Sequence, residues 1–141
     1  MEKESEIIYG KEAEKRGLSV GELRVFMNKW QKRLEMSGWK LDLKIVDFKT
    51  KNNYRKSGDF VANLGKKEAT ILMTCDPWRG DEEYTLVHEM LHILVYDYDQ
   101  YSEKFVLKLC EKDSTPHGIY MDKLETAVHQ LTRIILGRSD R

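Results

Sequence analysis

Two histidines and a glutamate in the middle of the chain have the types and the spacing of a metal site. His88, Glu89 and His92 form a His-Glu-x-x-His motif. Residues four apart on a helix lie on one face, so both imidazoles can point at one ion. Glu89 is about 100° around the helix from His88, where a carboxylate reaches a metal-bound water more readily than the metal. The pattern predicts half of a zinc hydrolase site, in which two nitrogens hold zinc and Glu89 takes a proton from its bound water.

The residues around this motif help to separate a metal site from a chance pairing of histidines. The simplest alternative is an ordinary helix that happens to carry them. The other members of this stretch are apolar on nearly every side, which is typical of a buried helix: Leu86, Val87, Met90, Leu91, Ile93, Leu94 and Val95. Burying two imidazoles and a carboxylate costs free energy unless they have polar partners. A metal ion supplies that partner, so the surroundings favour the metal site.

A third ligand is required, because a catalytic zinc ion takes three protein ligands and leaves one position open. The candidates after the motif are Glu103, Glu111, His117, Glu125 and His129. His117 falls in a predicted loop over 115–118, and a loop holds a ligand with less accuracy than a helix. Glu125 and His129 lie one turn apart at the edge of the apolar face of the last predicted helix. Glu125 also has the spacing of a capping box with Asp122, which is a structural alternative to metal binding.

Hydrophobic periodicity predicts the elements that position these side chains. An amphipathic helix over about 20–36 begins with the capping box of Ser19 and Glu22. Alternating apolar and polar residues predict three strands, of which the last two form a hairpin. The strands cover about 39–45, 60–64 and 69–74. The motif helix covers about 81–96, and Ser102 is a candidate cap for a short helix within 102–112. A last helix follows its cap Asp122, and its expected core stripe is Leu124, Val128, Leu131 and Ile135, with Ala127 and Ile134 beside it.

The order of these elements predicts an α+β fold. An N-terminal helix precedes a small three-stranded antiparallel sheet, and the motif helix and a C-terminal helix follow, with the helices packed on one face of the sheet. The chain has no repeat and no Pro/Gly-rich linker. We therefore expect a single domain over residues 19–138, preceded by a charged lead-in over residues 1–18.

Composition argues against several other classes of protein. Of the 141 residues, 40% are hydrophobic, which is enough for one modest core. Lys plus Arg and Asp plus Glu both number 24, so no overall charge favours nucleic acid or a membrane surface as a partner. Cys75 and Cys110 belong to no CxxC pattern, which disfavours a secreted disulfide framework. With no apolar signal region and no membrane-spanning run in the sequence, we expect a cytoplasmic protein.

The motif, followed by a glutamate on a later helix, resembles the gluzincin group of zinc metallopeptidases. The closer similarity is to its shortest members, the minigluzincins and the small phage-type metallopeptidases, over roughly residues 20–136. This resemblance implies a zincin-like fold with His88, His92 and Glu125 as zinc ligands. It also implies that Glu89 is the general base.

The chain departs from the pattern of larger gluzincins after Glu125. Those enzymes often have an aspartate four residues later, bonded to the first histidine, where this chain has His129. The group that orients His88 is therefore left open, although a carboxylate or a carbonyl usually does this. The resemblance also implies an extra donor for the oxyanion, and the candidates are His117, Tyr120 and His129.

Together these features predict a zinc-dependent metallopeptidase that hydrolyses peptide bonds in a peptide or protein substrate. Zinc polarises the carbonyl, and Glu89 moves a proton from the zinc-bound water to the leaving amine. The substrate is expected to pair with the sheet edge beside the motif helix. Two alternatives differ in class: a non-catalytic zinc-binding or protein-interaction module of a mobile element, and a metal-dependent hydrolase of other substrates. Glu89 favours catalysis, because a structural zinc site does not need it.

Overall fold

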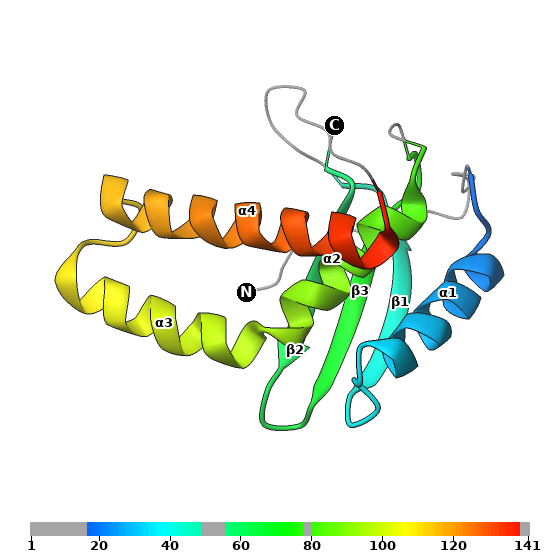
Figure 1. The fold of residues 1–141 in the computed structure, drawn as a ribbon, viewed down its shortest axis with the longest axis horizontal. Coiled ribbons are helices and arrows are strands. Elements are labelled where there is room, and N and C mark those ends of the chain that lie inside the picture. The colour runs from blue at the N-terminus through cyan, green and yellow to red at the C-terminus, as the bar shows by residue number, and fades with distance from the viewer. Residues whose placement is uncertain (1–16, 49–55, 78–79, 139–141) are drawn as a thin grey trace.

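The computed structural model describes residues 17–48, 56–77 and 80–138. One helix, three strands and three further helices follow one another in this part of the chain, so the predicted α+β class is confirmed (Figure 1). Most of the predicted lead-in over residues 1–18 lies outside the described residues. The elements are α1 (Val20–Arg33), β1 (Lys40–Val46), β2 (Gly58–Asn63), β3 (Glu68–Thr74), α2 (Glu82–Leu94), α3 (Tyr96–Leu109) and α4 (Thr115–Leu136).

The sheet is mixed, so the predicted wholly antiparallel sheet is wrong. The strand order is β1-β3-β2. β2 and β3 form the predicted antiparallel hairpin, whereas β1 runs parallel to β3. Alternation of apolar residues determines which face of a strand is buried, but not the direction of its neighbour. β3 is buried almost throughout, as suits a strand with neighbours on both sides, and β2 is left at an edge.

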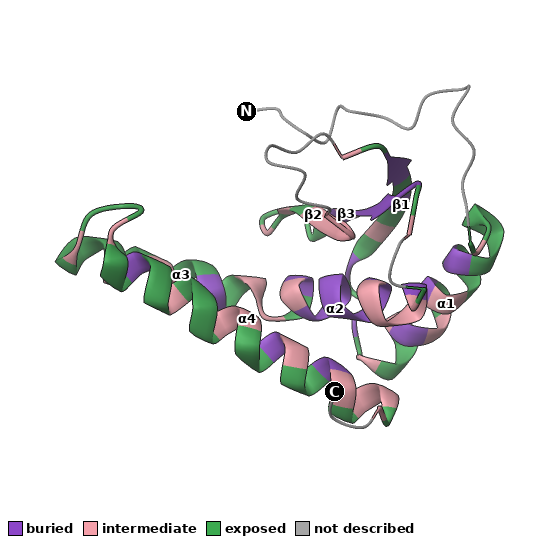
Figure 2. Ribbon diagram, turned by 90° about the horizontal axis from the view of Figure 1, so that it is seen from above, coloured by how far each residue is buried: buried purple, intermediate pink, exposed green. Residues whose placement is uncertain are grey.

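The helices α1 and α2 lie on the same face of the sheet, and α4 lies beyond α2 (Figure 2). The capping box of Ser19 and Glu22 starts α1 as predicted. α2 contacts β2, β3, α1 and α4. Because it is surrounded in this way, α2 buries most of its apolar residues, as its sequence predicts. The site residues on α2 are therefore held on a helix that is fixed from several sides.

The helices after α2 begin earlier than predicted. α3 starts at Tyr96, so the short helix expected within 102–112 is only the second half of a longer one. α4 starts at Thr115, where the Ser114 side chain accepts a hydrogen bond from the backbone N–H of His117. The predicted loop over 115–118 is wrong, because proline is well tolerated in the first turn of a helix. Asp122 consequently lies inside α4 and caps nothing, which removes the capping-box alternative for Glu125.

The buried face of α4 is rotated from the predicted stripe. Val128 and Thr132 are buried, whereas Leu131 is 43% exposed. Thr132 can be buried because its hydroxyl donates a 2.7 Å hydrogen bond to the carbonyl of Val128. This rotation moves the inward face toward Glu125 and His129, whose side chains meet α2.

Cys75 and Cys110 are both free thiols. No helix in the described ranges combines the length and the apolar character needed to cross a lipid bilayer.

Candidate metal site and its cleft

α2 places the motif residues beside α4. His88 and His92 lie one helical turn apart, and their ring centroids are 4.8 Å from each other. His88 and Glu89 are buried, and His92 is partly buried. Both histidines meet α4 through the same residue, Glu125. The helical spacing thus places both imidazoles on the side of α2 that meets Glu125.

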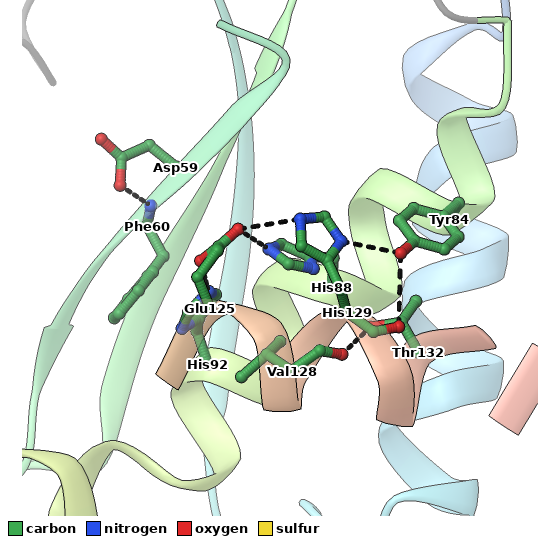
Figure 3. Close-up of polar contacts among 9 residues, drawn as sticks. All are labelled: Asp59, Phe60, Tyr84, His88, His92, Glu125, Val128, His129 and Thr132. Atoms are coloured by element: carbon green, nitrogen blue, oxygen red, sulfur yellow. Dashed lines mark hydrogen bonds and ion pairs between the residues drawn. The ribbon is translucent and has the colours of Figure 1, made fainter. Parts of the chain in front are cut away.

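The carboxylate of Glu125 lies between the two motif histidines (Figure 3). Its Oε2 is 2.9 Å from His88 Nε2, and its Oε1 is 3.0 Å from His92 Nε2. Hydrogen bonds from His88 and His92 hold the pKa of Glu125 well below its usual range, against the opposing effect of partial burial. The structure thus brings together the three residues for which the sequence predicts zinc binding.

The donor types and their spacing fit a zinc ion. Two imidazole nitrogens and one carboxylate form the His₂Glu set of known catalytic zinc sites. Donors that each lie about 2.1 Å from one tetrahedral zinc are roughly 3.4 Å apart, which is close to the N–O distances of 2.9 and 3.0 Å found here. His88 and His92 contact different oxygens of this carboxylate, and the donors grouped within 4.8 Å of one another are those of His88, Glu125 and His129, so His92 has to turn toward His88 for all three predicted ligands to hold one ion.

In the ranges that the structure describes, His88 lacks a hydrogen bond to Nδ1, the ring nitrogen that faces away from Glu125. His88 Nδ1 is buried and has no hydrogen-bond partner among the described residues. The group that orients the first histidine, which the sequence leaves open, is thus not found in the described part of the chain. Ring contacts restrain His88 instead: Tyr84 stacks on it at 6.2 Å between centroids, and His129 lies 4.3 Å away.

Glu89 is buried on the side of α2 that meets β2. Its side chain packs closely against the backbone of Gly58 in β2, where an added Cβ would lie 3.2 Å from Glu89 Cγ. Burial raises the pKa of Glu89 well above its usual value, and the charges of Asp59 and Glu125 raise it further, while Lys56 opposes them. A carboxyl group with a raised pKa next to two candidate ligands suits a proton carrier.

We expect Gly58→Ala to destabilise the fold and to displace Glu89. The new Cβ would lie 2.9 Å from Thr85 Cγ2 and 3.2 Å from Glu89 Cγ, so the strand and the helix must separate. Overpacking of this kind costs about 1–3 kcal/mol, measurable by urea unfolding. Adding Thr85→Ser removes the nearest methyl group and should restore part of the loss. Equal stability of the wild-type and Gly58→Ala proteins would show that β2 and α2 are not tightly packed here.

A cleft of about 970 Å³ opens over these residues. Its walls are the segment 56–60 and residues of α2, α3 and α4. Phe60 of β2 stacks on His92 with 5.7 Å between ring centroids. Because β2 is an edge strand of the described sheet, one side of its backbone borders the cleft without a strand partner there.

Of the three predicted oxyanion donors, one lines the cleft. His117 is buried elsewhere, with Nε2 2.7 Å from Glu103 Oε2 and Nδ1 accepting from the backbone N–H of Asp113. The Tyr120 hydroxyl donates to Asp99 at 2.6 Å, and burial together with this bond raises its pKa. His129 lines the cleft. His117 and Tyr120 thus tie the start of α4 to its surroundings and do not reach the motif.

Two aromatic residues at the site were not identified from the sequence. Tyr84 lies one turn before His88 on α2, and its hydroxyl is 2.8 Å from His129 Nδ1. The i, i+4 rule that pairs His88 with His92 also places Tyr84 on their face, so this signal was present. Phe60 had no such signal, because nothing local indicates that this position on β2 meets His92.

Comparisons with known proteins identify no relative of this chain. The chain matches no family model, no curated protein and no solved structure. The similarity to gluzincins rests on the motif spacing and the later glutamate, and it stays a prediction. What the chain does must therefore be inferred from the donor types and the geometry of its cleft.

Proposed function

We propose that this protein is a zinc-dependent metallopeptidase whose zinc is held by His88, His92 and Glu125. The observation that supports the proposal best is the position of the Glu125 carboxylate, 2.9 and 3.0 Å from the Nε2 atoms of the two motif histidines. The histidines belong to α2 and the glutamate to α4, and Glu125 follows His88 by 37 positions and His92 by 33 positions in the chain. A chance pairing of histidines would not require a carboxylate at this point.

Bound zinc would supply a Lewis acid that polarises the substrate carbonyl and makes water a stronger acid. Glu89 takes a proton from the attacking water and then delivers it to the leaving amine. Its burial excludes competing solvent, and its raised pKa favours holding the proton between these two events. The chain thus provides two of the ligands and a proton carrier within about one turn of α2, and the third ligand on α4.

The proposed substrate is an extended peptide. The edge of β2 offers backbone hydrogen-bonding groups along one side of the cleft, as in proteins that bind peptides by adding a strand to a sheet. The cleft volume of about 970 Å³ lies at the upper end of the range for ligand sites, which suits several peptide residues. A small-molecule substrate would not need the strand edge.

We expect the purified protein to contain one zinc ion per chain and to lose stability when the ion is removed. A ligand that binds only the folded state stabilises it by about 2.7 kcal/mol at a hundredfold excess over its dissociation constant. EDTA should therefore lower the melting temperature on the order of 10 °C for a chain of this size, and added zinc should restore it. Elemental analysis and thermal unfolding check this. Absence of zinc together with an unchanged melting temperature would refute the proposed metal site.

Cleavage of a generic denatured protein, with and without EDTA, tests the activity itself. Zinc-dependent cleavage supports the peptidase. Tightly bound zinc without cleavage of any denatured protein would favour the non-catalytic module instead.

A further inference from the structure

The last helix offers two donors with the same spacing as the histidines of α2. Glu125 and His129 lie four residues apart on α4, and His129 Nε2 is 3.1 Å from Glu125 Oε2. One ligand atom each from His88, Glu125 and His129 all lie within 4.8 Å of one another. α4 therefore contributes an i, i+4 pair of donors to this group, and α2 contributes His88.

The Tyr84 hydroxyl determines which nitrogen of His129 faces this point. It donates to the carbonyl oxygen of His129 at 3.3 Å and lies 2.8 Å from Nδ1. Both the Nδ1 and the backbone carbonyl of His129 are therefore in contact with Tyr84, which leaves Nε2 turned toward Glu125.

His129 Nε2 lies 3.1 Å from Glu125 Oε2, close to the roughly 3.4 Å expected between two donors of one tetrahedral zinc. Together with His88 these two residues form a group of donors that could hold one ion. A ligating histidine is usually oriented by a hydrogen bond at its other ring nitrogen, and the Tyr84 hydroxyl makes such a contact with His129 Nδ1.

We propose that His129 is a fourth protein ligand of the zinc ion, with Tyr84 as its positioning residue; this inference rests on the proposed function. Four protein donors close a tetrahedral site, whereas a catalytic ion needs an open position. Of the three histidines, His129 has the most room to withdraw, because its side chain is 39% exposed against 8% for His88 and 13% for His92, whereas Glu125 is in contact with all three histidines. The resting site is therefore closed by His129 and opens to substrate when this side chain moves into the cleft.

Cobalt(II) substitution tests the number of protein donors without measuring activity. A four-coordinate cobalt site absorbs visible light more strongly than one in which water raises the coordination number. We expect a strong spectrum from the wild-type protein and a weaker one from His129→Ala, with recovery when free imidazole is added.

Metal affinity, measured by competition with a chelator, should fall at least about 100-fold in His129→Ala, and about 10–100-fold in Tyr84→Phe, the range for outer contacts. Gln130→Ala, at the next and exposed position of α4, is the matched control and should change neither property.

The outcomes separate this inference from the proposed function. If the wild-type protein binds cobalt and His129→Ala keeps both its spectrum and its affinity, His129 is not a ligand and the 3.1 Å contact is an ion pair with Glu125. If His129→Ala lowers affinity but imidazole does not restore the spectrum, its role is structural and the inference fails. Tyr84→Phe, which keeps the ring, provides the same test if His129→Ala does not fold. A wild-type protein that binds neither cobalt nor zinc overturns the metal site itself.

Discussion

Replacing Glu89 with glutamine is expected to lower the rate of peptide hydrolysis by about two orders of magnitude or more, while zinc stays bound. Glutamine has the same shape but cannot accept a proton from water. The geometry supports this proposed role, since Glu89 follows His88 in sequence and its side chain lies against β2. Burial raises the pKa of Glu89 well above its usual value, which favours its holding a proton taken from water.

The measurement is the initial rate of cleavage of a denatured protein, with zinc content determined on the same samples. Glu68→Gln is a suitable control, because Glu68 is exposed at the start of β3 and should keep the full rate. Loss of zinc from Glu89→Gln would mean that the glutamate holds the ion or its ligands. Full activity of Glu89→Gln would make Glu89 a structural residue and would exclude the proposed proton transfer.

Replacing Glu125 with alanine is expected to remove most of the bound zinc. Glu125 is the residue that all the other donors meet, with contacts of 2.9, 3.0 and 3.1 Å to His88, His92 and His129. Its loss removes a negative ligand, so the decrease in affinity should exceed the roughly 10–100-fold typical of groups outside the ligand shell. Chelator competition, followed by elemental analysis after dialysis, measures this decrease.

His117→Ala is the matched control for the loss of zinc. His117 was the loop candidate for the third ligand, and the structure pairs it with Glu103, away from the motif. Its replacement should cost stability at the junction of α3 and α4 while zinc remains. Retention of zinc by Glu125→Ala with loss of zinc from His117→Ala would refute the ligand assignment.

The sequence by itself determined the local features of this protein. The capping box of Ser19 and Glu22, the hairpin of β2 and β3 and the buried motif helix are confirmed. Each depends on residues close together in the chain, where helical or strand periodicity decides which side chains share a face. For the same reason the pairing of His88 with His92 followed from their spacing alone.

Only the tertiary structure decided how these elements meet. The parallel pairing of β1 with β3 and the rotation of α4 depend on contacts between distant segments, and local periodicity carries little information about them. The early start of α4 at Thr115 excluded the capping-box alternative for Glu125. The packing of α4 on α2 then brought Glu125 and His129, out of five candidates, to the motif histidines, because these contacts form between two helices and not within either one.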